Sequence, residues 1–153
     1  MDARDCPNIV PTLAAIGAYV DGRLRVVGGR LTRLHKAPRV EAMVAELSAA
    51  GVDIESVHRD GVCDGFEVRG RPWYPGGRMF SSWGDHRIVM SLFVAGLRMR
   101  SANLLSGAEG VSLSFPDFFA QFARAGVRTS LVDDGGVPLD RHVHPNAGAS
   151  HLV

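Results

Sequence analysis

The stretch "IVPTLAAIGAYVDGRLRVVG", residues 9–28, returns later in the chain as "IVMSLFVAGLRMRSANLLSG", residues 88–107. One constant offset of 79 (88 − 9 = 79) aligns five identical pairs: Ile9/Ile88, Val10/Val89, Leu13/Leu92, Gly17/Gly96 and Gly28/Gly107. A second match joins "AGV" at 50–52 to "AGV" at 125–127 with an offset of 75, so we expect the connector between the two matches to have lost four residues (79 − 75 = 4). Although two amphipathic helices can look alike by chance, the shared glycines and their order favour an internal duplication.

Each half of this duplication is predicted to contain a helix, a strand, a second helix and a second strand. Apolar periodicity and turn residues predict helices over 8–20, 38–50, 85–97 and 115–125, and strands over 23–27, 52–58, 65–70, 102–106 and 128–132. Strands 52–58 and 65–70 form a predicted hairpin through Arg59-Asp60-Gly61. The alternation predicts an α/β or α+β fold with helices packed on sheet. We expect one domain over 1–133, with repeats at about 1–70 and 80–133, and a disordered tail over 134–153.

Composition excludes several classes of protein. The chain has 153 residues, 46% of them hydrophobic and 22% charged, so a normal core can form. A net charge of +1 gives no general attraction to nucleic acid or to an acidic membrane. Cys6 and Cys63, the two cysteines, lack metal-ligand spacing, and the longest apolar run, 88–97, is too short to cross a bilayer. We therefore expect a soluble, cytoplasmic protein that binds neither nucleic acid nor membrane.

The triplet Asp85-His86-Arg87 stands at the start of the most apolar predicted helix. Asp85 is a suitable N-cap, because its carboxylate can accept from a free amide of the first turn. Those amides and the helix dipole make the potential positive there, so a cation in the first turn costs roughly 0.3–1 kcal/mol. A phosphate or carboxylate bound at the helix start would reverse that sign. The triplet therefore indicates either an anion site or an N-cap followed by two surface side chains.

A second group of basic residues precedes the predicted helix over 38–50. Its members lie within "RLTRLHKAPR", residues 30–39: Arg30, Arg33, His35, Lys36 and Arg39. A solvated basic loop would explain them equally well. In the repeat frame, however, both groups lie beside helix starts at the end of the same layered unit, so we expect them to face one cleft.

The motifs "GDHRIVM", residues 84–90, and "SFPDFFAQFARAGV", residues 114–127, together resemble the C-terminal lobe of the 5-enolpyruvylshikimate-3-phosphate synthase family. The upstream segments "DCPNIVPTLAAIGAYVDG", 5–22, and "HKAPRVEAMVAELSAAGVDI", 35–54, fit the same family, and the resemblance extends from residue 1 to about 132. It implies a lobe of repeated units, each with two helices and a four-stranded sheet. It also implies transfer of an enolpyruvyl group from phosphoenolpyruvate to shikimate 3-phosphate, in aromatic amino-acid biosynthesis, without a metal or organic cofactor.

The resemblance also assigns roles to individual residues. Arg87 corresponds to an arginine that grips phosphoenolpyruvate, with Asp85 and His86 shaping the helix start, and Lys36 and Arg39 correspond to basic residues on the same side of that ligand. The family's N-terminal lobe is missing, however, and residues 36–39 (KAPR) are one residue shorter than the family pattern and lack its acidic members. Leu113 stands where the family has a lysine, and residues 8–11 (NIVP) lack the acid that many members carry, so no catalytic residue is assigned.

Three functions follow from this pattern. The chain can be the C-terminal part of an enolpyruvyl transferase that works with a separate N-terminal lobe. It can be a truncated or diverged remnant of such an enzyme. It can also be a non-catalytic α/β module that binds another anion or a protein partner. Self-association through the face left bare by the missing lobe is a further expectation.

Overall fold

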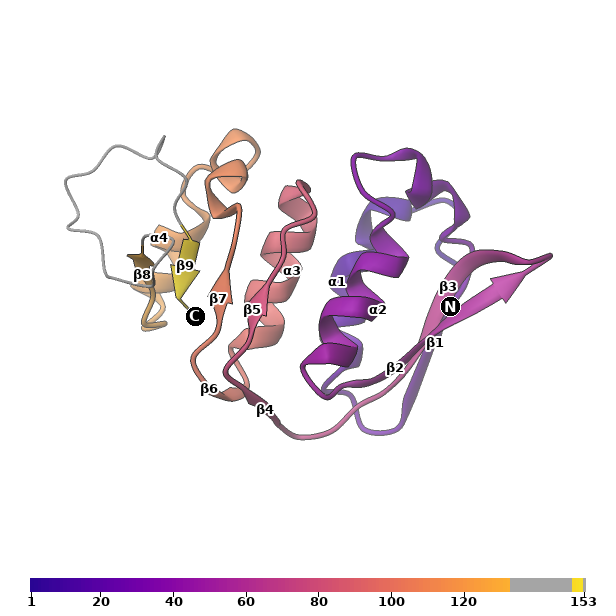
Figure 1. Ribbon diagram of the computed structural model, residues 1–153, viewed down its shortest axis with the longest axis horizontal. Helices are drawn as coiled ribbons and strands as arrows, with labels where there is room; N and C mark the ends of the chain where they lie inside the picture. Colours follow the sequence, from indigo (N-terminus) through magenta and orange to yellow (C-terminus); the bar gives the residue numbers. More distant parts are fainter. Residues whose placement is uncertain (133–149, 153) are drawn as a thin grey trace.

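The computed structural model describes residues 1–132 and 150–152 (Figure 1). The α-helices in this part are α1 (Val10–Gly17), α2 (Arg39–Ala49), α3 (His86–Gly96) and α4 (Phe118–Arg124). Short 3₁₀ helices precede three of them: η1 (Pro7–Ile9), η2 (Arg30–Leu34) and η3 (Ala108–Leu113). The strands are β1 (Arg23–Val26), β2 (Asp53–Arg59), β3 (Val62–Arg69), β4 (Tyr74–Gly76), β5 (Met79–Phe80), β6 (Met99–Ser101), β7 (Leu104–Leu105), β8 (Ser130–Val132) and β9 (Ser150–Leu152).

This architecture confirms the predicted mixture of helices and sheets. The helices over 38–50 and 85–97 are found within one residue of their expected bounds. Helix α4 begins at Phe118 rather than at 115, since Pro116 and Asp117 form a turn before it. The hairpin of β2 and β3 turns through Asp60 and Gly61, which both have positive φ, as a two-residue hairpin turn requires. Strand β3 begins at Val62, three residues earlier than expected.

The two halves of the chain build the same kind of sheet. In the first half the order is β1-β3-β2, and Asp2 adds a parallel bridge to Val27 beyond β1. In the second half the order is β5-β7-β9-β8, with β5 parallel to β7. The bond from Val27 N to Met1 O (3.0 Å) recurs as the bond from Ser106 N to Phe80 O (3.0 Å), at an offset of 79 for both partners (106 − 27 = 79; 80 − 1 = 79). This recurrence supports the inferred duplication, whose boundaries stay a prediction.

The C-terminal residues correct one expectation. Most of the predicted tail, at 134–149 and 153, lies outside the described residues, but Ser150–Leu152 forms β9 and pairs antiparallel with both β7 and β8. Strand β9 therefore occupies the place that β3 has in the first half. The expectation of a loose tail does not hold for these three residues, which pair with β7 on one side and with β8 on the other. Their low periodicity hid this role, since a strand of three residues is too short to show one.

The four residues that the second half lacks are missing from α4, not from the connector where we expected the loss. Helices α2 and α4 start at the same offset of 79 (118 − 39 = 79). Helix α2 has 11 residues and α4 has 7, a difference of 4 (11 − 7 = 4), and each is followed by a glycine with φ +90°, Gly51 or Gly126. The deletion is thus one helical turn inside α4, not a shortened connector.

One hydrophobic core runs through both halves. Helices α1, α2 and α3 contact one another, with the β1-β3-β2 sheet against α1 and α2, and β4 and its flanking loops cross from one half to the other (Figure 1). Side chains buried in this core include Val10, Met43, Phe66, Leu92 and Phe93. Helix α3 packs against both α1 and α2, and hydrogen bonds from Arg39 to Asp85 and to Asn8 bring the starts of α2, α3 and η1 together.

Candidate anion site at two helix starts

Asp85 is the N-cap of α3, as its position before the apolar helix predicted. Its backbone is extended (φ −120°, ψ 115°), and its Oδ1 accepts from the amide of Arg87 at 2.8 Å. This bond satisfies one of the free amides of the first turn. The amide of Ile88 in the same turn donates to Asp85 O at 3.0 Å. The helix dipole keeps the potential at this start positive.

A buried ion pair joins this cap to the start of α2. Arg39 is the first residue of α2, and its Nε donates to Asp85 Oδ2 at 2.7 Å, with the two residues 5% and 1% exposed. The Nη1 of Arg39 also donates to Asn8 Oδ1, 2.9 Å away in η1. The starts of η1, α2 and α3 are therefore tied together, and the two helix starts that we expected to be neighbours are neighbours. Since Arg39 is engaged by protein acceptors, it holds the site together and is not a free cation.

The ion pair sets the charge of Asp85. Burial on its own raises the pKa of this carboxyl, but hydrogen bonds from Arg39 and from the Arg87 amide, together with the charges of Arg39 and His86, outweigh burial and lower the pKa. Asp85 is consequently ionised at neutral pH. Its carboxylate forms an ion pair with Arg39, and its charge also acts on His86.

Three other expected residues surround the pair. Lys36 is exposed in the loop before α2, while His86 and Arg87 are half-buried in the first turn of α3. Burial lowers the pKa of His86, Asp85 opposes this effect, and Arg87, Arg39 and Lys36 lower the pKa further. The imidazole thus senses cations from α3, from α2 and from the loop before α2. A small anion at this place would be bound by Lys36, Arg87 and the first amides of α3.

The other basic residues before α2 do not join this group. Arg33 forms an ion pair with Glu41 (Nε to Oε1, 3.0 Å), so its guanidinium is engaged by a carboxylate of α2. Arg30 and His35 are exposed. For these three residues the solvated basic loop describes the structure, whereas Arg39 pairs with Asp85 and Lys36 is close enough to lower the pKa of His86.

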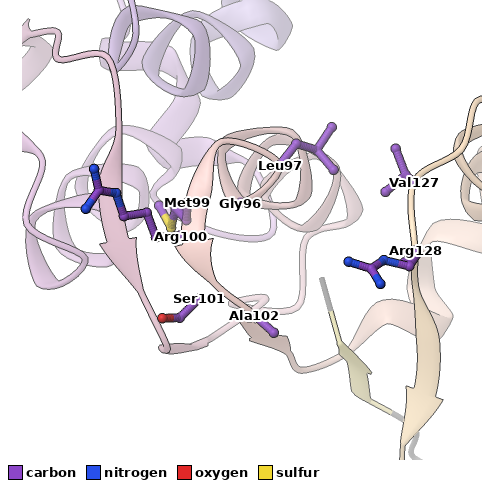
Figure 2. Close-up of a pocket in the computed structure, with 8 residues that line it drawn as sticks. All are labelled: Gly96, Leu97, Met99, Arg100, Ser101, Ala102, Val127 and Arg128. Atoms are coloured by element: carbon purple, nitrogen blue, oxygen red, sulfur yellow. The ribbon is translucent and has the colours of Figure 1, made fainter.

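Separate cavities lie elsewhere in the fold. Figure 2 shows one of about 280 Å³ at the C-terminal end of α3, lined by residues that include Leu97, Arg100, Ala102 and Arg128. Arg128 extends from the segment before β8 toward that end of the helix (Figure 2). The carbonyl groups at this end of the helix carry a partial negative charge, and the guanidinium groups of Arg100 and Arg128 line the same cavity. None of the five predicted site residues lines it.

Two positions show how this chain departs from the motifs it resembles. Leu113, in the place of the expected lysine, ends η3 with 86% of its surface exposed, and Leu34, 79 residues earlier (113 − 34 = 79), is 83% exposed at the end of η2. Asn8 lies in the segment 8–11, which lacks the acid that the resemblance implies, and its neutral amide accepts a hydrogen bond from Arg39. The sequence pointed to both departures, but it could not show that Asn8 contacts Arg39.

Two further findings bear on the class of site. In the described part of the chain, no group of three or more His, Cys, Asp or Glu side chains is placed to hold a metal ion. None of the helices in residues 1–132 combines the length and the apolar character needed to cross a bilayer.

Comparison with known proteins agrees with the motifs. The family model described as EPSP synthase (3-phosphoshikimate 1-carboxyvinyltransferase) matches residues 1–122. The 3-phosphoshikimate 1-carboxyvinyltransferase of Clostridium novyi is 32% identical over 126 residues, which cover 82% of this chain and 28% of the relative. That of Halobacterium salinarum is 38% identical over 125 residues, which cover 82% of this chain and 28% of the relative. The solved EPSP synthase of Acinetobacter baumannii matches with a TM-score of 0.69 and 29% identity over 80% of this chain and 27% of that one.

These relatives are much longer than the region they share with this chain. The chain spans about 28% of the length of the Clostridium and Halobacterium enzymes. The shared region includes both helix starts, because the matched residues 1–122 contain all five predicted site residues. On this evidence the chain belongs to the EPSP synthase (3-phosphoshikimate 1-carboxyvinyltransferase) family.

Proposed function

We propose that this chain supplies the phosphoenolpyruvate-binding part of an enolpyruvyl transferase that acts on shikimate 3-phosphate. The supporting observation is the junction of two helix starts through Arg39 and Asp85, with Lys36, His86 and Arg87 around it. Phosphoenolpyruvate carries a carboxylate and a phosphate, and both are anions of the kind that helix-start amides and a guanidinium bind. The residues over 1–133 form the proposed domain, and the cytoplasm is its proposed compartment.

In the proposed addition–elimination, the oxygen of a shikimate 3-phosphate hydroxyl bonds to the central carbon of phosphoenolpyruvate while the methylene carbon takes up a proton. The methylene carbon then gives up a proton, the double bond forms again, and the bond from the central carbon to the phosphate oxygen breaks. Phosphate leaves with its electron pair, and the hydroxyl proton is released to a base. Arg87 and Lys36 would stabilise the negative charge of the carboxylate and of the departing phosphate. We assign no residue of this chain as the base, because the segment 8–11, where the resemblance implies an acid, contains none and its polar residue, Asn8, is a neutral amide.

The second substrate requires a partner. Relatives are more than three times longer than the matched region, so we propose that a complementary N-terminal lobe completes the shikimate 3-phosphate site. The exposed Leu113 and the neutral Asn8 leave fewer charged groups for the transition state than the motifs imply. We therefore expect no release of phosphate by the chain alone.

The test is a titration of the pure chain with phosphoenolpyruvate, followed by a phosphate-release assay with and without the N-terminal lobe of a relative. We expect binding by the pure chain and turnover in the mixture only. Arg87→Ala should abolish most of the thermal shift that phosphoenolpyruvate causes, because it removes a guanidinium at the α3 start. Arg128→Ala removes the same charge at the other end of α3 and should leave the shift unchanged. Equal losses from both variants would refute the placement.

A non-catalytic anion-binding module is the second candidate, and Leu113 and Asn8 are the observations that favour it. Such a module would bind phosphoenolpyruvate or another small anion and would release no phosphate in any mixture. The remnant hypothesis predicts weak binding and no partner. The phosphate-release assay with the complementary lobe separates both of these from the transferase.

A further inference from the structure

The segment between β5 and α3 is held by a carboxylate of the other repeat. Glu46 lies on α2, two turns after Arg39, and its Oε2 accepts from the amide of Ser81 at 3.1 Å. Its Oε1 accepts from the indole Nε1 of Trp83 at 2.8 Å. Hydrogen bonds to a charged acceptor are roughly twice as strong as neutral ones. Both of these bonds reach the short segment that leads into Asp85.

This segment has a backbone that needs support. Trp83 has φ +50°, and the other non-glycine residue with positive φ in the described chain, Asp60, lies in a hairpin turn. A bulky side chain in the left-handed region is strained and persists only where its surroundings fix it. Two serines add local bonds, from Trp83 N to Ser81 Oγ (3.3 Å) and from Gly84 N to Ser82 Oγ (3.2 Å). Glu46 is the partner that connects this strained segment to α2.

We infer that Glu46 is a positioning residue of the anion site, acting through Ser81 and Trp83 on the cap of α3. The segment ends at Asp85, whose amide donates to Ser82 O at 3.0 Å and whose carboxylate caps Arg87 and binds Arg39. Helix α2 thus contacts the start of α3 at two places: Arg39 binds Asp85, and Glu46 binds the segment that leads into Asp85. The inference rests on the proposed function, because it assumes that the α3 start binds an anion.

Electrostatics and positioning predict opposite signs at this residue. Glu46 is an acid near a proposed anion site, so a purely electrostatic role predicts that Glu46→Gln tightens binding. A positioning role predicts weaker binding, because the strained segment then leaves its binding-competent state part of the time and the apparent affinity falls with that fraction. The sign of the change in affinity decides between the two roles.

The experiment measures phosphoenolpyruvate affinity of the full chain by calorimetry for Glu46→Gln, Trp83→Phe and Glu41→Gln. We expect Glu46→Gln to raise the Kd about fivefold, as a binding-competent fraction of about one fifth would require. Trp83→Phe removes the indole donor without changing any charge and should raise the Kd as well. Glu41→Gln removes a carboxylate from the first turn of the same helix without touching residues 81–85, so it should leave binding unchanged or tighten it.

A spectroscopic measurement keeps the two proposals apart. The NMR signal of the Arg87 amide, which reports on the cap, should move in Glu46→Gln without any ligand and should stay in place in Glu41→Gln. If the wild type does not bind phosphoenolpyruvate but this amide still moves, the proposed function fails and the link from Glu46 to the cap is supported. If the wild type binds, and Glu46→Gln and Trp83→Phe bind as tightly with the amide unmoved, the inference about Glu46 is overturned. Should Glu46→Gln not fold, Trp83→Phe supplies the same test.

Discussion

The two repeats share a backbone but differ in chemistry at the starts of α2 and α4. Arg39 and Phe118 are the first residues of these helices and occupy the same repeat position (118 − 39 = 79). Arg39 reaches across to the cap of α3 in the other repeat. Phe118 stays within its own repeat, with its ring centroid 5.2 Å from that of Phe93 in an edge-to-face contact.

This difference shows where a duplicated fold can place a polar site. Within one repeat, the start of the second helix packs on the first helix, and the α4 example fills this contact with aromatic rings of Phe93, Phe118 and Phe122. Between repeats, the start of α2 meets the start of α3, so free amides and a dipole from both helices meet there. A site that needs two helix starts therefore forms at the junction, and Arg39 and Asp85 are the residues that join it.

The largest expected effect breaks this junction. Arg39→Leu leaves the buried carboxylate of Asp85 without its cation, and breaking one side of a buried pair costs about 3–5 kcal/mol of unfolding free energy. Adding Asp85→Asn to Arg39→Leu removes the stranded charge and keeps an N-cap, so it should restore at least half of the loss. Urea unfolding of the single and double variants measures both numbers.

The matched change in the other repeat is Phe118→Leu, which costs about 1–2 kcal/mol through lost ring contacts. Combined with Asp85→Asn, its cost should add, because the ring partners of Phe118 differ from the hydrogen-bond partners of Asp85. A loss below about 1 kcal/mol for Arg39→Leu, or additive losses for Arg39→Leu and Asp85→Asn, would show that the junction does not depend on the ion pair.

The sequence allowed much of this comparison to be predicted. The helices over 38–50 and 85–97 follow from apolar periodicity, and the cap at Asp85 follows from capping chemistry. The constant offset follows from the repeated residues themselves. All three signals can be read directly from the sequence. The partner of Arg39 is not local. Five basic residues lie between 30 and 39, and only the packing of α2 on α3 decides that Arg39 is the one that meets a buried carboxylate.

The same limit explains the other misses. Glu46 and Trp83 are 37 residues apart, and no spacing rule connects them. The turn missing from α4 was misplaced because an offset change between two motifs does not say where between them the deletion lies. Strand β9 was missed because three residues carry no measurable alternation.

A smaller effect sharpens the equivalence of the two repeats. Gly51 and Gly126 follow α2 and α4 with the same φ of +90°. A Cβ at Gly51 would meet Pro75 Cδ at 3.9 Å, an ordinary contact, and a Cβ at Gly126 would meet nothing within 4 Å. Gly51→Ala and Gly126→Ala should therefore each cost about 1–2 kcal/mol from backbone conformation alone. Thermal unfolding of both variants checks whether the costs agree, and a difference above about 1 kcal/mol would mean that the two helix ends are not equivalent.

The smallest expected effect is a pH dependence that one junction residue confers. Burial and the cations of Arg87, Arg39 and Lys36 lower the pKa of His86, and Asp85 opposes them. A bound dianion would stabilise the protonated imidazole and raise that pKa again, so binding should take up a proton. Affinity for sulfate, which does not titrate near neutral pH, should therefore rise about threefold as the pH falls from about 8 to about 6.

The sign follows from the direction of the shift. In the free protein the lowered pKa keeps His86 neutral over most of this range, and the complex binds the additional proton at the lower pH, so the complex gains stability as pH falls. Calorimetry of sulfate binding in two buffers of different ionisation enthalpy counts the protons taken up. His86→Gln, which keeps a polar side chain of similar reach but cannot titrate, should remove both the proton uptake and the pH dependence. A wild-type affinity for sulfate that stays constant or falls toward pH 6 would show that the anion binds away from His86. The start of α3 would then not be the anion site that distinguishes the junction from the start of α4.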